Sequence, residues 1–142
     1  MKKIFMPVFI MLMLFACKKK TVDAPPAQTK ENISGQYKLT ALTAKTATTP
    51  ETDILVTYVT ACRRDDIQQF KADLTYNYID AGTKCSPAGD DNGAWSLPAP
   101  GKMLIDGVNF DIISFTGPML VLSNVDVLLG TSTTFKTTLT KQ

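Results

Sequence analysis

The chain of 142 residues contains no histidine. Histidine is the side chain most often used for general acid/base catalysis near neutral pH, and it is also the commonest metal ligand. Nucleophilic sites built on a Ser–His or Cys–His pair are therefore excluded. We expect no catalytic residues, no metal and no other cofactor, because the remaining nitrogen and sulfur ligands are too few for a metal centre.

The chain also lacks an excess of charge of either sign. It carries 15 basic and 13 acidic residues, and two of the basic ones, Lys2 and Lys3, lie within residues 1–16, which contain no acid. The rest of the chain therefore holds 13 residues of each sign. A domain that binds nucleic acid normally presents a strongly basic surface. We therefore expect no nucleic-acid partner.

The apolar run near the start of the chain is too short to span a bilayer. As a helix, residues 4–15 would cover roughly 18 Å, against a hydrocarbon core of about 30 Å. The run follows two lysines and ends before a small residue, as in a secretory signal peptide over residues 1–16. The Leu14-Phe15-Ala16-Cys17 end resembles the lipobox of bacterial lipoproteins, which implies that Cys17 is lipidated and becomes the mature N-terminus. The alternative is an ordinary signal peptide followed by a chance cysteine.

The segment after the signal, residues 17–32, has little to bury. It contains three consecutive lysines, residues 18–20, and the pair Pro25-Pro26, a composition typical of a disordered or semi-extended tether. We expect the lipid on Cys17 to attach this tether to a bacterial envelope membrane. An acidic run after the cysteine indicates transport to the cell surface in some bacterial groups. The basic run here favours the periplasm, with the cell surface as the alternative.

Cysteine is scarce, and the three present form an odd count. In an exported protein, an odd count indicates a disulfide and one cysteine with another role. With Cys17 assigned to the lipid, Cys62 and Cys85 remain, and thiols in an oxidising compartment form pairs. We expect a Cys62–Cys85 disulfide that contributes about 3 kcal/mol to stability in the chain-entropy account.

From residue 33 onward, short alternating runs of apolar and polar residues indicate β-strands. Asp106-Gly107 between two such runs predicts a tight hairpin. Residues 54–61 fit either a strand or a short lid helix. About eight short strands with hairpin-length connections indicate an antiparallel meander, closed as a barrel or folded as a sandwich. Apart from residues 54–61, the expected strands are residues 33–42, 66–70, 75–79, 93–97, 102–106, 108–115, 119–124 and 133–140.

Acidic pairs and two arginines are the polar candidates for a site: Asp65-Asp66, Asp90-Asp91 and Arg63-Arg64. Paired carboxylates can bind calcium, but neighbouring residues of a strand point in opposite directions, and the spacing of a calcium loop is incomplete. We interpret the acids as turn and cap residues. The arginines either clamp a carboxylate or phosphate group or form solvated ion pairs with Asp65 or Asp66, and we favour the ion pairs.

Aromatic residues occupy period-two positions on different expected strands, so several can face one interior. They would either fill the core or line a cavity for an apolar ligand. Core filling is favoured on grounds of size, because a small domain has little interior to spare. The residues that would line a cavity are Tyr37, Tyr76, Tyr78, Trp95, Phe110 and Phe135.

Motifs in three parts of the chain resemble the lipocalin-like domain family of bacterial lipoproteins: G-Q-Y-K-L from Gly35, C-R-R-D-D-I-Q-Q-F from Cys62 and G-A-W-S-L from Gly93. The resemblance implies an all-β fold, an eight-stranded antiparallel up-and-down barrel over residues 33–142. It also implies a lipid anchor and a binding or structural role without catalysis. Leu74 stands where the family has a glycine. Because leucine does not readily adopt positive φ, we expect a different type of turn there.

Two functional hypotheses follow. The first is a membrane-anchored lipoprotein whose barrel binds a small hydrophobic or amphipathic ligand in the cell envelope. The second is a non-enzymatic module of an envelope complex, in which a filled barrel docks onto a protein partner that the sequence does not identify. An internal cavity is the feature that separates the two.

Overall fold

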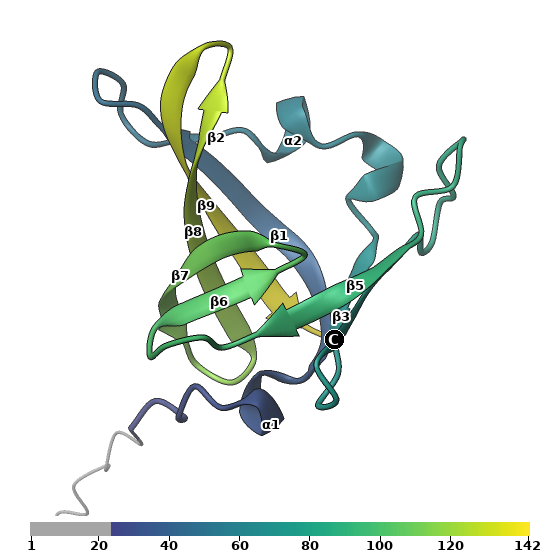
Figure 1. The fold of residues 1–142 in the computed structure, drawn as a ribbon. Coiled ribbons are helices and arrows are strands. Elements are labelled where there is room, and N and C mark those ends of the chain that lie inside the picture. Colours follow the sequence, from purple (N-terminus) through teal and green to yellow (C-terminus); the bar gives the residue numbers. More distant parts are fainter. Residues whose placement is uncertain (1–23) are drawn as a thin grey trace, which may run out of the picture.

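The computed structural model describes residues 24–142, and within them the chain folds as a β-barrel (Figure 1). The expected signal peptide and Cys17 lie outside the described residues. The helical elements described are α1 (Lys30–Ile33), α2 (Leu55–Tyr58) and the 3₁₀ turn η1 (Ala61–Arg63). The strands are β1 (Gly35–Lys45), β2 (Thr52–Asp53), β3 (Ile67–Phe70), β4 (Thr75–Ile79), β5 (Asp91–Ser96), β6 (Lys102–Ile105), β7 (Val108–Phe115), β8 (Met119–Leu128) and β9 (Thr131–Lys141).

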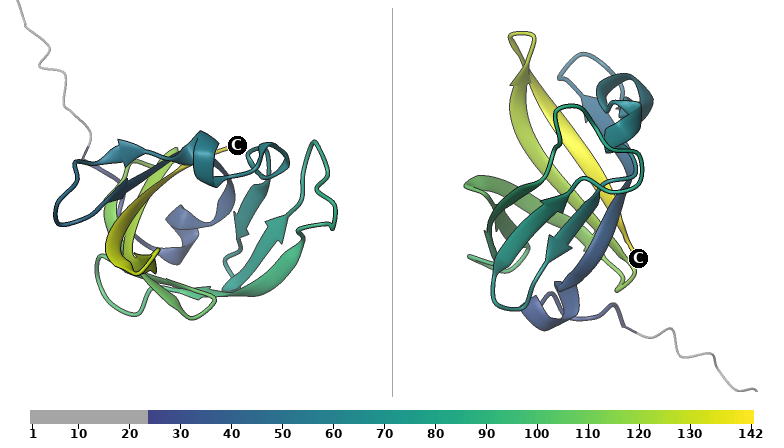
Figure 2. Two further views of the ribbon diagram at one scale, coloured as in Figure 1. Left: turned by 90° about the horizontal axis from the view of Figure 1, so that it is seen from above. Right: turned by 90° about the vertical axis from the view of Figure 1, so that its right-hand side faces the viewer.

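The first strand closes the barrel, because it pairs antiparallel with both β3 and the last strand, β9. From β3 to β9 the order is sequential, and Figure 2 shows the resulting ring from above. Eight strands form the ring, while β2 only adds a short edge to β1 at Thr43 and Ala44. The expected eight-stranded up-and-down barrel is confirmed, and the sandwich alternative is excluded.

Residues 54–63, called the strap here, run along the upper rim of the barrel in the view of Figure 1. They form α2 and η1, so the lid helix is the correct alternative for this segment. Asp53 Oδ1 accepts a hydrogen bond from Leu55 N at 2.9 Å at the start of α2. The β-branched residues of the strap favour a strand, but only its first residue stays on the sheet, where Ile54 N donates to Leu42 O at 2.9 Å directly after β2.

The hairpin of β8 and β9 is longer than expected and rises above the rest of the barrel (Figure 1). β8 pairs with β9 along its whole length, but it pairs with β7 only as far as Ser123. Residues 124–128 therefore have an open edge, where Val125 and Val127 are 66% and 68% exposed. The expected strand ended at residue 124, so residues 125–128 of β8 were not predicted.

α1 closes the lower end of the barrel. Ile33 is fully buried, and the Tyr37 hydroxyl donates a hydrogen bond to Ile33 O at 2.6 Å. Burial raises the pKa of the Tyr37 phenol to about 12, so this hydroxyl stays protonated at neutral pH. Lys141 Nζ donates to Asn32 O at 3.2 Å, which joins the start of the fold to its end. Within residues 24–142, regular structure thus begins with α1, inside the segment expected to be a tether.

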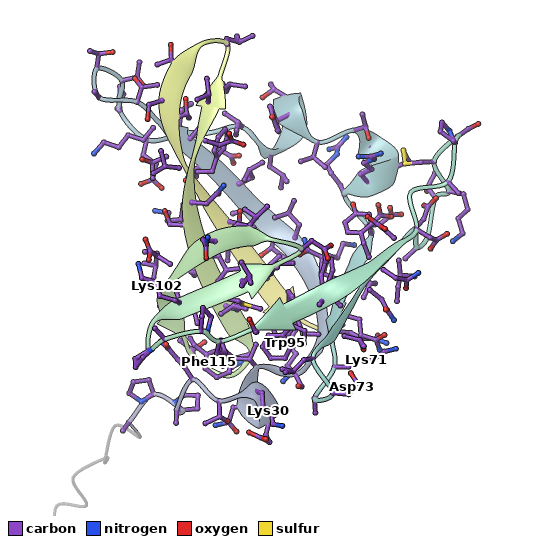
Figure 3. The ribbon with its side chains drawn as sticks, viewed as in Figure 1. Lys30, Lys71, Asp73, Trp95, Lys102 and Phe115 are labelled. Atoms are coloured by element: carbon purple, nitrogen blue, oxygen red, sulfur yellow. A yellow bond between two sulfur atoms is a disulfide. The ribbon has the colours of Figure 1, made fainter. Side chains whose placement is uncertain are left out.

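Large side chains fill the lower half of the barrel. The ring centroid of Phe70 lies 5.7 Å from that of Tyr37 and 5.5 Å from that of Trp95. Trp95 is 2% exposed, and its Nε1 donates to Lys71 O at 2.8 Å. Figure 3 shows Trp95 and Phe115 in this half, above α1. The lower half is therefore a packed core. Its aliphatic members include Ile33, Met103, Leu120, Leu122 and Leu139.

The turn between β3 and β4 holds a leucine in the left-handed conformation. Leu74 has a φ of 71°, so the expectation that leucine avoids positive φ here is wrong. Leu74 N donates to Lys71 O at 3.0 Å, and Trp95 N donates to Leu74 O at 2.9 Å. Asp73 Oδ1 also accepts from Thr75 N at 3.0 Å. These contacts hold a conformation that costs an L-residue about 1 kcal/mol.

Replacing Leu74 with glycine removes this cost, because glycine adopts positive φ freely. Leu74 is 38% exposed, so little apolar contact is lost. We expect Leu74→Gly to raise the free energy of unfolding by about 0.5–1 kcal/mol, measured by urea denaturation. Ala72→Gly in the same turn is the control, because φ of Ala72 is not positive and the substitution should not stabilise. Equal destabilisation by both substitutions would contradict strain at Leu74.

Candidate functional site

The inward faces of β3 to β7 leave an open cleft at the upper end of the barrel, called the mouth cleft here. Its volume is about 430 Å³, which is within the range of small-molecule sites. Successive side chains of a strand point to opposite faces, so every second residue near the upper ends of these strands reaches the cleft. Its aromatic and aliphatic lining consists of Tyr76, Tyr78, Ile105, Val108 and Phe110.

A smaller hollow of about 290 Å³ lies between the strap and the barrel wall, and is called the strap hollow here. Leu39 of β1 and Val59 of the strap supply apolar surface. Arg63, Gln68 and Tyr78 line both this hollow and the mouth cleft. The two spaces therefore adjoin at these three side chains.

The aromatic residues proposed as a cavity lining divide into two groups. Tyr76, Tyr78 and Phe110 come together at the mouth cleft. Tyr37 and Trp95 are buried in the packed core of the lower half instead. Tyr76 connects the two groups, because it is 8% exposed, its ring centroid lies 5.2 Å from that of Phe70, and it also lines the mouth cleft. Both alternatives considered for these residues are thus realised in one barrel. Period-two alternation places a residue inside or outside the barrel, but it does not say at which height the interior is filled.

Phe135, the sixth predicted lining residue, lines neither hollow. It lies half-buried on β9, with its ring centroid 6.1 Å from that of Tyr58 in α2. Tyr58 belongs to the strap, for which the sequence allowed either a strand or a short helix. Ile105 and Val108 were missed as lining residues, although they flank the predicted Asp106-Gly107 turn.

The two tyrosines of the mouth cleft keep their protons at neutral pH. Burial raises the pKa of the Tyr76 phenol, and it is also the main cause of the raised pKa of Tyr78. The carboxylate of Asp66 adds to the rise at Tyr78. The Tyr76 hydroxyl donates to Gln68 Oε1 at 3.4 Å. Both phenols are therefore neutral, and since their protons are engaged by Gln68 and Asp66, each offers a ligand its oxygen as a hydrogen-bond acceptor.

Neither Arg63 nor Arg64 has a carboxylate partner within residues 24–142, so the expected ion pairs with Asp65 or Asp66 are wrong. Both carboxylates are used elsewhere, because Asp65 Oδ2 accepts from Thr83 N at 2.8 Å and Asp66 Oδ1 accepts from Ala81 N at 3.0 Å. The two acids thus serve a turn, as expected. The ion pairs of the described residues are Lys30–Glu31, Lys102–Asp111 and Lys136–Glu51.

Two other carboxylates, Asp91 and Asp106, lie in the mouth cleft. Asp91 Oδ1 accepts from Asn92 N at 2.8 Å, and Asp106 Oδ1 accepts from Ala94 N at 3.0 Å. Gly93 makes room for this arrangement, because a Cβ atom there would overlap the Asp106 carboxylate. The sequence assigned both acids to turns and gave no sign that they border a cleft.

The predicted disulfide between Cys62 and Cys85 is confirmed, with a Cα–Cα distance of 5.3 Å. It connects the strap to the loop between β4 and β5. Asp80 is fully buried beneath this loop, and one of its carboxylate oxygens accepts from Cys85 N at 3.2 Å and from Gly89 N at 3.1 Å. Because Gly89 lines the mouth cleft, the disulfide and Asp80 together fix one side of its rim.

Residues 24–142 contain no cluster of three or more His, Cys, Asp or Glu side chains that is placed to hold a metal ion. None of the helices in that part of the chain is long and apolar enough to cross a membrane.

Comparison with protein-family models gave no match, and no curated protein sequence matches the chain at a significant level.

Removing the disulfide should lower stability, because it frees a loop whose ends are 23 residues apart. We expect the Cys62→Ser/Cys85→Ser double variant to lose about 3 kcal/mol of unfolding free energy in urea denaturation. Dithiothreitol should have the same effect on the wild-type domain and none on the double variant. An unchanged unfolding midpoint of the reduced wild-type protein would contradict this role of the bond.

Proposed function

We propose that the protein binds a small hydrophobic or amphipathic molecule in the mouth cleft, as a lipocalin-like barrel tethered to a bacterial envelope membrane. The observation that carries the proposal is the division of the interior. The rings of Tyr37, Phe70 and Trp95 fill the lower half, and the same core continues through Tyr76 and Ile105 to the floor of the mouth cleft. Tyr78 and Phe110 pack against this core and border the open part of the cleft. An eight-stranded barrel has room for its own side chains or for one small ligand. The space left by the lower core is therefore where a ligand fits.

The lining of the mouth cleft suits such a ligand chemically. Aromatic and aliphatic side chains supply apolar surface, whose burial stabilises a complex by about 25 cal/mol for each Å². Gln68 and the neutral phenols add a few groups that form hydrogen bonds, the usual composition of a small-molecule site. The proposed role is binding without catalysis, since the chain has no histidine to form a nucleophile–base pair.

The membrane tether in this proposal rests on the sequence of residues 14–17. α1 closes the end of the barrel that lies opposite the strap (Figure 1). A tether that precedes α1 therefore leaves the mouth cleft on the side away from the anchor. We place the domain in the periplasm, with the cell surface as the alternative.

A second candidate, a protein-interaction module, is favoured by the open edge of β8. Thr116 N donates to Met119 O, so the odd-numbered residues of β8 direct their backbone groups toward the β7 side. Above Ser123 that side has no β7 partner, and Val125 and Val127 lie there with exposed side chains. Such an edge fits an extended segment of a partner protein, which would pair as an added strand.

Filling the mouth cleft should abolish ligand binding while preserving the fold. Val108 is 46% exposed and lines the cleft, so Val108→Trp places a large ring in the space without disturbing the core. We expect the purified domain to bind the neutral dye N-phenylnaphthylamine, and the variant to bind it at least tenfold more weakly. Fluorescence titration of the dye measures both affinities.

Ile113→Trp is the matched control, because Ile113 lies on the same strand, is 57% exposed and is not part of the cleft. It should leave the affinity for the dye unchanged. Equal loss in both variants would contradict binding in the cleft. A wild-type domain that takes up no dye, but crosslinks to an envelope protein through a photoreactive residue at position 127, would favour the interaction module instead.

The tether part of the proposal predicts that Cys17 carries the membrane anchor. We expect Cys17→Ser to move the protein from the membrane fraction to the soluble fraction of the host cell, because stable attachment requires the acyl chains. Mass spectrometry of the wild-type mature N-terminus should show an acylated Cys17. An unmodified Cys17, or a mature protein that starts elsewhere, would refute the lipid anchor.

A further inference from the structure

Arg63 lies where the mouth cleft and the strap hollow adjoin, since it lines both. It ends η1 and directly follows Cys62, whose disulfide to Cys85 ties the backbone at this point to the neighbouring loop. The guanidinium therefore extends from an anchored position of the rim. Arg64, the next residue, lines neither space.

The guanidinium of Arg63 is available to a ligand. It has no ion pair within the described residues, and Asp65 and Asp66 are engaged by backbone N–H groups. An arginine side chain stays charged at all physiological pH values and carries five N–H donors in a planar arrangement that matches a carboxylate. The positive charge of Arg63 also acts on Tyr78, where it lowers the pKa of the phenol against the larger effect of burial.

Gln68 adds a hydrogen-bond donor at the same place. Gln68 Oε1 accepts from the Tyr76 hydroxyl, which leaves the amide nitrogen of Gln68 to donate. The Tyr78 hydroxyl also lies at the junction, but burial and a hydrogen bond with the Asp66 carboxylate raise its pKa, so its proton is already engaged. Donors from one charged and one neutral side chain thus meet at the junction of the two spaces.

Charge distinguishes the two sides of this junction. Arg63 is the charged residue that lines the strap hollow, whereas the mouth cleft also contains Asp91 and Asp106. Arg63 therefore attracts an anionic group to the strap side, where the Asp66 carboxylate bonded to Tyr78 offsets part of the attraction, and Asp91 and Asp106 repel it from the far wall of the mouth cleft. The apolar side chains of Ile105 and Phe110 lie in the mouth cleft, where an apolar tail can be buried.

We propose that the ligand is an amphiphile with a carboxylate group, which Arg63 binds beside the strap while the apolar tail occupies the mouth cleft. This rests on the ligand binding proposed above and specifies the chemical class of the ligand. A carboxylate that forms two parallel hydrogen bonds with a guanidinium is held more strongly than a neutral group in the same place. The filled lower half of the barrel keeps the tail in the upper half.

The test compares two ligands that differ only in the head group, dodecanoate and dodecanol. Each is titrated against the domain loaded with N-phenylnaphthylamine, and displacement of the dye gives its affinity. We expect the wild-type protein to bind dodecanoate at least tenfold more tightly than dodecanol, because a hydrogen bond to a charged group is worth about 1.5–3 kcal/mol.

The variants identify the group responsible. Arg63→Gln should weaken dodecanoate about tenfold and leave dodecanol unchanged, because only the acid needs the positive charge. Arg64→Gln is the matched control and should change neither affinity. Asp91→Asn should tighten dodecanoate by about twofold to threefold, since it removes a repelling charge from the cleft.

Equal affinities of the two ligands for the wild-type protein, or equal effects of Arg63→Gln and Arg64→Gln on dodecanoate, would overturn the carboxylate assignment. Both results leave the binding of apolar ligands intact, because the dye and dodecanol still bind. A wild-type domain that binds neither the dye nor the two ligands would overturn the carboxylate assignment and the proposed function together.

Discussion

The pairing of β1 with β9 is the interaction on which the rest of the structure depends. Eight residue pairs, from Tyr37–Lys141 to Lys45–Thr134, join the first strand of the barrel to the last. This closure fixes a small interior that cannot expand to suit its contents. Aromatic rings that pack one end of such an interior leave the space at the other end to solvent or to a ligand. The closure occupies one edge of β1; β3 and the short β2 pair with parts of the other edge, and the chain then leaves the sheet as the strap.

Carboxylates near the rim are used mainly to hold backbone. Asp65 and Asp66 accept hydrogen bonds from the loop after β4, and Asp80 holds the loop that the disulfide closes. A buried backbone N–H needs a partner, and a carboxylate is a strong acceptor for it. This use of the acids explains why Arg63, although it is close to them in sequence, remains without a carboxylate of its own.

The parts of the fold that depend on local pattern could be predicted from the sequence, and those that depend on the closed barrel could not. Alternation predicted most strands, and the odd number of cysteines predicted the Cys62–Cys85 bond. Whether an aromatic residue packs in the core or lines the cleft depends on its height along the barrel axis. Period-two alternation gives the face of the strand on which a residue lies, but not this height. Leu74 shows the same limit, because contacts from Lys71 and Trp95 impose a φ that local propensity opposes. The mouth cleft combines residues from five strands and the strap, so only its aromatic members were predicted.

The position of α1 has a mechanical consequence. A force applied through the chain that precedes residue 30 passes into β1, which is flanked by β9 and β3 on its two sides. Hydrogen bonds of antiparallel strands lie perpendicular to the strand axis, so a pull along β1 loads many of them at once in shear. The contact of Lys141 with Asn32 adds a further bond at the point where the load begins. The barrel is thus attached to the preceding chain through a strand whose pairs with β9 and β3 must break together.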